Sequence, residues 1–450
     1  MSSSARLLVL LAALAAAAAG WEREPWSAFE QRRRSLMAER SGSFALLFGY
    51  EENEAPYGPG PLRQESNFYY LTGCLEPGAA LLLEQPGDGR QYRETLFLPA
   101  RNPNRERWTG PRIDPSARDA DERTGVAEVA PLSRLEAAVR KAADRRLRGY
   151  GLLPQSAPDS EGGRTPGRFS LWSDWGLAQP SDIRPEIETM RRIKSPGELA
   201  LIEKAVEASA RAHIEAWRGV RAGLYEHQVA ARFAATLLDR GALRFAYPPI
   251  IGSGRNATIL HYSRLEAALE PGDLLLADVA GEYARYTADL TRTIPVSGRF
   301  TDRQREIYEA VLGAQDAMLE LCGPGAALDG PGERSLTAAA HRYLERRRRG
   351  WSKMLPHSGG HHVGLDVHDP GELSDRLEPG MVITLEPGLY FADEGLGVRI
   401  EDMAVVTDDG CRILSRQLPR RIADIERGLE TALPQESAGV RNFDSRSRIR

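Results

Sequence analysis

The sequence predicts a mixed α/β (α+β) protein built from two domains. The first half of the chain alternates short apolar runs with amphipathic helical patterns, and the second half places paired strand patterns between long helices. A well-defined helix start near Ser195 separates the two halves. The chain has 450 residues, of which 42% are hydrophobic, so each domain can bury a core of its own.

Residues 1–20 form a separate segment. Arg6 supplies a positive charge, and the apolar run from Leu7 to Ala19 is too short to span a bilayer comfortably. Small residues then precede Trp21. This pattern is typical of a secretory signal peptide, with an uncleaved membrane anchor as the alternative. We therefore expect an exported protein, periplasmic or secreted, that has no membrane span once the signal is removed.

The N-terminal domain is expected over residues 21–188. Apolar runs bounded by turn residues predict strands, and apolar residues spaced three and four apart predict helices. The predicted strands cover 44–50, 68–73, 78–89 and 94–100, and the predicted helices cover 29–40 and 132–147. The polar, glycine-rich stretch 155–168 predicts a loop. Strands that alternate with helices favour an α/β layer.

The second domain is expected over residues 189–421, and its first helix has a clear start. Ser195 can cap this helix, Pro196 suits its first position, and Glu198 completes a capping box. His213 lies on the apolar stripe of the same helix, where we expect a packed histidine and not a metal ligand. Further helices are predicted at 226–240 and 301–321.

Two pairs of strands are predicted between these helices. The runs 273–281 and 282–296 meet at Gly281-Glu282, which we interpret as a hairpin turn. The runs 381–391 and 396–407 make a second pair. Residues 422–450 turn polar and predict a flexible tail.

Charge and cysteine content limit the classes of function. The formal net charge is −4, so the chain lacks the basic bias that favours nucleic-acid binding, and we expect no nucleic acid as a partner. Three cysteines, Cys74, Cys322 and Cys411, are too few for a disulfide framework on which the fold depends. We expect all three cysteines to be core or surface residues without a role. A Cys322–Cys411 bridge is compatible with the count, but nothing in the sequence supports it.

Five side chains of the second domain have the chemistry of a site for two metal ions. They are Asp278, Asp289, His361, Glu386 and Glu401. The two aspartates can meet across the predicted hairpin, and His361 lies in a segment that holds four of the eight histidines. Taken singly, each acid also fits a turn, a cap or the surface. Together, four carboxylates would repel one another and raise their pKa values unless divalent cations balanced the charge.

The motifs around these residues resemble the aminopeptidase P and prolidase branch of the pita-bread metallopeptidases, which also include the methionine aminopeptidases. The resemblance is carried by ILHY (His261), ADVAGEY (Asp278), ADLTRT (Asp289), HHVGLDVHD (His361 and His368), TLEPGLY (Glu386) and GVRIED (Glu401). RQESNFYYLTGCLEPGAALLL and RNPNRERWTGPRI resemble the N-terminal domain of aminopeptidase P, and the likeness extends over residues 28–421. Ser358 and His362 depart from the pattern, since relatives often have glycine and tryptophan there. We do not expect His362 to be a ligand.

The resemblance implies a creatinase-like α/β N-terminal domain followed by a pita-bread catalytic domain. It implies that Asp278 chelates one of two divalent ions, that Asp289 and Glu401 bridge both, and that His361 and Glu386 complete the second. A set of oxygen ligands with one imidazole favours Mn²⁺, with Co, Fe and Zn as alternatives.

The resemblance also implies the chemistry of the site. A hydroxide that bridges the metals would attack the scissile carbonyl, with Glu386 as proton acceptor and later donor. His368 and His261 would contact the substrate carbonyl and stabilise the oxyanion. The residues implied to line the pocket on the proline side are His357, Tyr390 and Arg399.

The function implied is that of an Xaa-Pro aminopeptidase, which releases the first residue from peptides with proline at position two. A prolidase restricted to Xaa-Pro dipeptides is the alternative, and RERWTGPRI and RQESNFYYLTG favour aminopeptidase P. A metal-free pita-bread domain that only binds peptides is a third reading, although such domains lose ligands and all five are present here. Relatives are commonly dimers or tetramers, so we expect a homo-oligomer.

Overall fold

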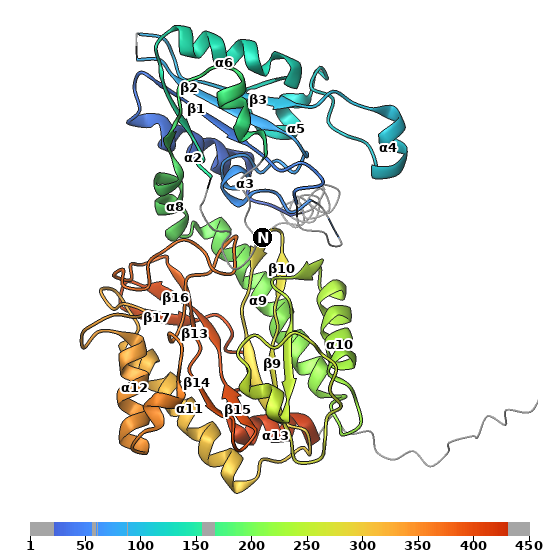
Figure 1. Ribbon diagram of the computed structural model, residues 1–450, viewed down its shortest axis with the longest axis vertical. Coiled ribbons are helices and arrows are strands. Elements are labelled where there is room, and N and C mark those ends of the chain that lie inside the picture. The colour runs from blue at the N-terminus through green and yellow to red at the C-terminus, as the bar shows by residue number, and fades with distance from the viewer. Residues whose placement is uncertain (1–21, 56–59, 61, 88, 155–166, 431–450) are drawn as a thin grey trace, which may run out of the picture.

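The computed structural model describes residues 22–55, 60, 62–87, 89–154 and 167–430. Two α/β bodies lie one above the other in Figure 1, the N-terminal one coloured blue to green and the C-terminal one green to red. Helix α8 (Arg184–Arg192) leads from the first body into helix α9 (Pro196–Trp217) of the second. The predicted mixed α/β class is confirmed. The predicted signal peptide lies outside the described residues, as does most of the predicted loop 155–168.

One mixed sheet organises the N-terminal body, in the strand order β4-β3-β2-β1-β5-β6. Its strands are β1 (Ser43–Phe48), β2 (Ala80–Gln85), β3 (Arg93–Leu98), β4 (Glu128–Pro131), β5 (Arg148–Gly151) and β6 (Ser181–Asp182). The first three strands pair antiparallel, and the pairs β1–β5, β3–β4 and β5–β6 are parallel. The helices of this body are α2 (Trp26–Ala38), α3 (Ser66–Thr72), α4 (Pro103–Thr109), α5 (Ala120–Thr124), α6 (Leu135–Asp144) and α7 (Leu171–Asp174).

Helix α3 corrects the strand predicted at residues 68–73. The Glu65 side chain accepts a hydrogen bond from the backbone N–H of Phe68 and so caps the helix. Gly73 ends it in the left-handed conformation, at φ 61°. A short, wholly buried apolar run has no period that separates strand from helix, so the caps decided the outcome.

Long helices surround the strands of the C-terminal body. After α9 come α10 (Glu226–Asp239), α11 (Asp302–Leu321), α12 (Leu336–Arg347) and α13 (Ile422–Glu430). The predicted capping box at Ser195 is present, because its hydroxyl accepts from the Glu198 N–H and the Glu198 carboxylate accepts from the Ser195 N–H. An equivalent box at Thr301 starts α11.

The strands of this body form four small sheets, ordered β12-β9-β8, β11-β10-β7, β13-β16-β17 and β14-β15. They are β7 (Arg244–Phe245), β8 (Ile250–Ser253), β9 (Leu274–Asp278), β10 (Gly281–Tyr283), β11 (Tyr286–Thr287), β12 (Thr291–Pro295), β13 (Val382–Leu385), β14 (Gly388–Phe391), β15 (Leu396–Arg399), β16 (Asp402–Thr407) and β17 (Gly410–Ile413). The predicted pairing of residues 381–391 with residues 396–407 is confirmed. The first run forms β13 and β14, which pair with β16 and β15 of the second run.

The first hairpin turns at a different place from the one predicted. Gly281 and Glu282 lie inside β10, and the turn between β10 and β11 uses Ala284 and Arg285. Both turn residues have positive φ, 49° and 79°, which suits the twist of a tight hairpin. The glycine signal was misleading because here two residues other than glycine adopt the left-handed conformation.

Two further predictions need correction. Residues 422–430, placed in a flexible tail, form helix α13, whose Ile425 and Leu429 are buried; residues 431–450 lie outside the described part. Cys322 and Cys411, predicted to have no role, form a disulfide that joins the end of α11 to β17, with a Cα–Cα distance of 5.7 Å. Cys74 is buried as a free thiol.

No helix in the described part of the chain combines the length and apolar character that a membrane crossing needs.

Candidate metal centre

A cavity of about 660 Å³ in the C-terminal body contains all five predicted metal ligands. Asp278 ends β9, and Asp289 lies between β11 and β12. Glu386 follows β13, Glu401 follows β15, and His361 lies in the loop between α12 and β13. The ends of four strands and one loop therefore converge on the cavity.

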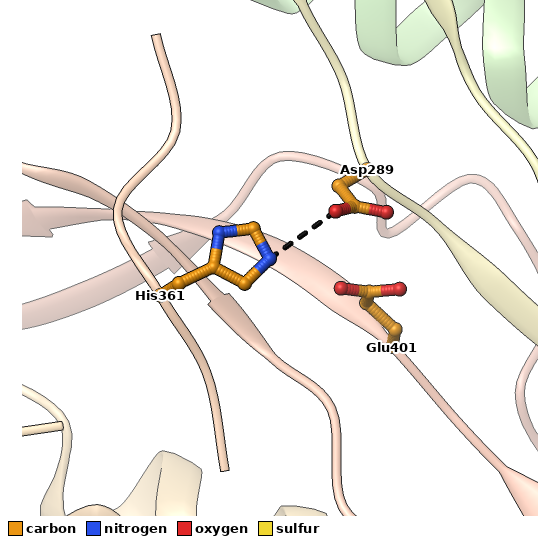
Figure 2. Close-up of side chains that lie close together, drawn as sticks. All are labelled: Asp289, His361 and Glu401. Carbon is orange, nitrogen blue, oxygen red and sulfur yellow. Dashed lines mark ion pairs between the residues drawn. The ribbon is translucent and has the colours of Figure 1, made fainter. Parts of the chain in front are cut away.

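Three of the five side chains form one close group. Ligand atoms of Asp289, His361 and Glu401 all lie within 4.8 Å of one another. Figure 2 shows the imidazole of His361 facing the two carboxylates, with its Nε2 3.2 Å from Oδ2 of Asp289. Oε1 of Glu386 lies 3.6 Å from the same nitrogen. The geometry thus brings an imidazole and three carboxylates to one point.

Asp278 joins this group through a residue that the sequence analysis missed. The Tyr247 hydroxyl lies 2.6 Å from Oδ1 of Asp278 and 2.6 Å from Oδ1 of Asp289. Arg399 donates to the other oxygen of Asp278 at 2.6 Å. A single tyrosine in the segment YPPI has no pattern that marks it as a site residue, so no sequence signal could have found Tyr247.

Burial and mutual repulsion make the carboxylates of this group difficult to ionise without cations beside them. Burial first, and the charge of Asp278 second, raise the pKa of Asp289 well above its ordinary value. Burial and the charge of Asp289 likewise raise the pKa of Glu401. Divalent ions would reverse both effects by favouring the ionised carboxylates. The donor set of carboxylates and one imidazole fits such ions.

Neighbouring groups orient two of these side chains. The Thr291 hydroxyl donates to Oε2 of Glu401 at 2.7 Å. Nδ1 of His361 lies 3.0 Å from the carbonyl oxygen of His362, which leaves Nε2 to face the carboxylates. Metal-binding histidines are commonly oriented in this way by a second hydrogen bond.

His213 is packed in the core, as the sequence predicted. Its Nε2 lies 3.0 Å from the carbonyl oxygen of Val279 and 3.2 Å from that of Leu290. These two residues directly follow Asp278 and Asp289, so His213 holds together the two segments that carry the aspartates. Burial lowers the pKa of His213 to about 4.

Of the residues expected to contact substrate, all but Tyr390 line the same cavity. His261, His357 and His368 all line it. The ring of His368 lies edge-on to that of His361, with 4.2 Å between centroids. Nε2 of His357 is 3.0 Å from the Tyr390 hydroxyl, to which Arg399 donates at 2.9 Å. His357, Tyr390 and Arg399 therefore form a connected unit.

A buried ionic network ties the histidine loop to the rest of the molecule. Asp369 accepts from Arg191 at 2.6 Å and from Lys194 at 2.8 Å. Asp366 accepts from Arg191 at 2.7 Å and from Arg63 of the N-terminal body at 3.0 Å. Both aspartates flank the segment that holds His368, so both bodies contribute to placing it.

Comparisons with known proteins agree with this site. The family described as "Metallopeptidase family M24" matches residues 200–408, and "Aminopeptidase P, N-terminal domain" matches residues 29–148. A Xaa-Pro aminopeptidase from Haemophilus influenzae is 34% identical over 89% of this chain and 97% of its own length. Mouse Xaa-Pro aminopeptidase 3 is 35% identical over 84% of this chain and 78% of its own length.

A solved structure shares the whole architecture. Aminopeptidase PepP from Pseudomonas aeruginosa superposes with a TM-score of 0.78 at 33% identity, covering 91% of this chain and 99% of that one. The match thus extends over both bodies of this chain. The chain belongs to the aminopeptidase P branch of metallopeptidase family M24 and is a hydrolase of the metallo-aminopeptidase class.

Proposed function

We propose that this chain is an Xaa-Pro aminopeptidase, which releases the first residue from peptides with proline at position two. The observation that carries the proposal is the group of Asp289, His361 and Glu401, whose ligand atoms lie within 4.8 Å of one another in one cavity. Relatives named Xaa-Pro aminopeptidase match almost the full chain and support the choice of substrate.

We propose two divalent ions in the cavity, with Mn²⁺ as the native metal. Asp278 would hold one ion, Asp289 and Glu401 would hold both, and His361 and Glu386 would hold the second. Hard carboxylate ligands with a single imidazole suit Mn²⁺. When bound, such ions polarise a carbonyl and lower the pKa of water toward ~7.

The protein side chains would handle the proton and the developing charge. Glu386 lies 3.6 Å from His361 and 4.0 Å from His357, so its carboxylate borders both the ligand group and the substrate side. It would accept a proton from the attacking water and return it to the leaving nitrogen. His368 and His261 would donate hydrogen bonds to the substrate carbonyl and stabilise the oxyanion.

The connected unit of His357, Tyr390 and Arg399 would form the wall that receives the proline ring. A bond to proline nitrogen is a tertiary amide without an N–H and with a fixed φ. A peptidase that grips an extended strand has no N–H to hold there. A rigid wall, held by bonds of 3.0 and 2.9 Å to the Tyr390 hydroxyl, suits a rigid ring.

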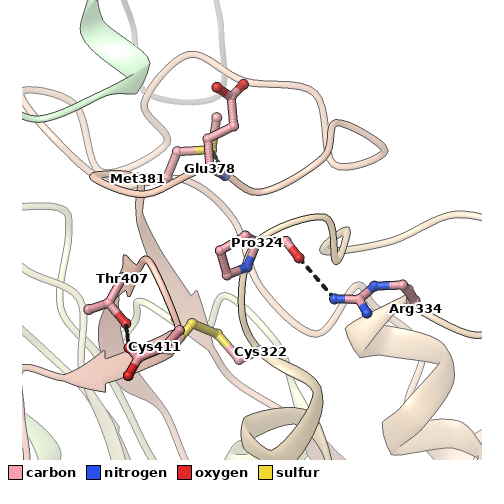
Figure 3. The surroundings of a disulfide bond; sticks show 8 residues. Cys322, Pro324, Arg334, Glu378, Met381, Thr407 and Cys411 are labelled. Atoms are coloured by element: carbon pink, nitrogen blue, oxygen red, sulfur yellow. Dashed lines mark hydrogen bonds between the residues drawn. A yellow bond between two sulfur atoms is a disulfide. The ribbon is translucent and has the colours of Figure 1, made fainter.

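Export of the protein through a signal peptide at residues 1–20 is also proposed. The disulfide between Cys322 and Cys411 supports it, since disulfides persist in oxidising compartments (Figure 3). N-terminal sequencing of material recovered outside the cytoplasm should find a start near Trp21. A cytoplasmic pool that keeps residues 1–20 would contradict export.

A product assay tests the proposed activity. The metal-loaded protein is given the dipeptide Ala-Pro and the tripeptide Ala-Pro-Ala, and products are separated by chromatography. We expect free Ala and Pro-Ala from the tripeptide, and no turnover by Glu386→Ala. Cleavage of the dipeptide alone would indicate a prolidase, and cleavage of neither peptide would refute the proposed function.

A further inference from the structure

The loop between β8 and β9, residues 254–273, carries His261, one of the two proposed donors to the oxyanion. The loop begins with the short 3₁₀ helix η3 (Gly254–Thr258), and His261 follows three residues later. The imidazole lines the cavity, and within the described part of the chain its ring makes no hydrogen bond. Its position therefore depends on the backbone that carries it.

The carboxylate of Glu226 bonds both halves of this loop. Glu226 is the first residue of α10 and is 0% exposed. Its Oε1 accepts from the N–H and hydroxyl of Ser253, at 2.8 and 3.0 Å, and from the side-chain amide of Asn256 at 3.1 Å. Its Oε2 accepts from the Tyr262 hydroxyl at 2.8 Å and from the Ala267 N–H at 3.1 Å. One side chain thus joins the parts of the loop on either side of the histidine.

The first half of the loop also lies against β15. Arg255 donates to the carbonyl oxygen of Ala392 at 2.8 Å. A Cβ atom on Gly397 of β15 would collide with the carbonyl oxygen of Ala257, so only glycine allows the two backbones to lie this close. This half therefore has a fixed support other than Glu226.

The second half of the loop is held by the start of α10. The backbone N–H groups of Glu226 and His227 donate to the carbonyl oxygens of Ala267 and Leu265, at 3.0 and 3.1 Å. The first N–H groups of a helix have no partner within the helix, so the loop supplies one. Leu265 has a φ of 59°, a conformation that a residue with a side chain keeps only where its surroundings hold it.

Tyr262, the neighbour of His261, is fixed at both ends of its side chain. Its hydroxyl bonds Glu226, and its ring packs with Ala257 and Leu276 in a small apolar cluster, against which Tyr390 also packs. A loss of the bond to Glu226 would free the tyrosine. Because the two residues are adjacent in the chain, a shift of Tyr262 would displace His261.

We propose that Glu226 is a positioning residue for His261, which fixes the loop so that the imidazole meets the substrate carbonyl. This inference rests on the proposed Xaa-Pro aminopeptidase function. The geometry of such a donor is strict, since a displacement of ~1 Å can lower the rate by ~10²-fold. Glutamine at position 226 would have the same shape but only one acceptor oxygen. Both halves of the loop present donors, so the amide could serve one half and would oppose the other.

A double-mutant cycle of Glu226→Gln and His261→Ala tests the proposal in the metal-loaded full chain. Release of Ala from Ala-Pro-Ala gives kcat and kcat/KM, and metal analysis gives the bound Mn²⁺. We expect Glu226→Gln to lower kcat and kcat/KM together by about 10- to 100-fold with wild-type metal content. In the His261→Ala background the same change should alter kcat by less than about twofold, because the donor that it positions is absent.

A milder variant and a control accompany the cycle. Tyr262→Phe keeps the ring and removes one of the five bonds to Glu226, so it should lower kcat less, and again only where His261 is present. It carries the cycle if Glu226→Gln does not fold. Glu426→Gln is the same change at another buried glutamate, which accepts from the Phe300 N–H at 3.0 Å and from Arg305 and does not line the cavity. Its kcat should equal that of the wild type.

Four results would overturn the role of Glu226 while the proposed function stands. They are a wild-type kcat in Glu226→Gln, an equal loss with and without His261, a loss of bound metal, and a loss of kcat as large in Glu426→Gln. If the wild type releases no Ala from Ala-Pro-Ala, the proposed function fails, and this inference fails with it.

Discussion

The guanidinium of Arg191 donates to the carboxylate of Asp369 at 2.6 Å, and the two side chains are only 3% and 1% exposed. Arg191 lies on α8, the helix that leads from one body to the other, and Asp369 directly follows His368. The connecting helix is thus bonded to the loop that carries His361 and His368. The loop is therefore held by Arg191, a residue that does not itself line the cavity.

Arg191→Met should therefore destabilise the protein and disturb the site. The substitution removes a buried cation that bonds both Asp369 and Asp366 and leaves Lys194 as the cationic partner of Asp369, and breaking a buried ion pair in this way costs up to about 3–5 kcal/mol. Urea unfolding measures the loss. Arg427→Met, which removes an exposed pair with Asp424, is the matched control and should cost about 0–1 kcal/mol. Equal effects of the two substitutions would show that the Arg191–Asp369 pair has no special role.

His213 predicts a specific dependence of stability on pH. Its pKa is about 4 in the folded state, because burial disfavours the charged ring, and about 6.5 when unfolded. The unfolded state therefore binds the proton more readily. The stabilising contribution is complete above pH 6.5 and is lost as the pH falls toward 4, by up to about 3 kcal/mol.

The variant His213→Gln isolates this contribution, because glutamine can still donate to the carbonyl oxygens of Val279 and Leu290 but does not titrate. The free energy of unfolding should fall less steeply between pH 6.5 and 4 in this variant than in the wild type. Parallel curves would show that His213 is not the source.

His361 and His368 should respond differently to substitution. His361→Ala removes the imidazole that faces Asp289 and should lose bound metal. His368→Ala should keep the metal and lower kcat and kcat/KM together by ~10²–10³, as expected for a donor to the oxyanion. Metal analysis beside steady-state kinetics distinguishes them. Metal lost from His368→Ala and retained in His361→Ala would reverse the two roles.

The disulfide should contribute to stability. Cys322 and Cys411 are 89 residues apart, and closing a loop of that length removes unfolded-state entropy worth about 4.6 kcal/mol in the loop model. The double variant Cys322→Ser/Cys411→Ser should lose that much in urea unfolding. A reductant should bring the wild type to the same level and leave the variant unchanged. A wild type that reductant does not affect would argue against the bridge in solution.

Sequence alone predicts features whose causes are local. Each capping box, at Ser195 and at Thr301, is formed by residues within one four-residue stretch. The starts of α9 and α11 were therefore correctly placed from the sequence. The five candidate ligands were found because their motifs resemble a known family. Helix α3 was missed, since a short buried apolar run carries no distinguishing period.

The contacts that complete the site are not local, and the sequence gives no sign of them. Arg191 and Asp369 are separated by 178 positions, and the Tyr247 hydroxyl reaches Asp278 across 31 positions. No pattern in a single sequence pairs such residues. They become visible only when the fold brings α8 beside Asp369 and Tyr247 beside the end of β9.

Titration of the chelator-stripped protein with Mn²⁺, followed by calorimetry and by release of Ala from Ala-Pro-Ala, tests the central claim most directly. The account predicts two ions bound per chain, activity that appears as the sites fill, and loss of both binding and activity in Glu401→Ala. Full activity of the stripped protein in chelator, or an intact binding curve in Glu401→Ala, would contradict it.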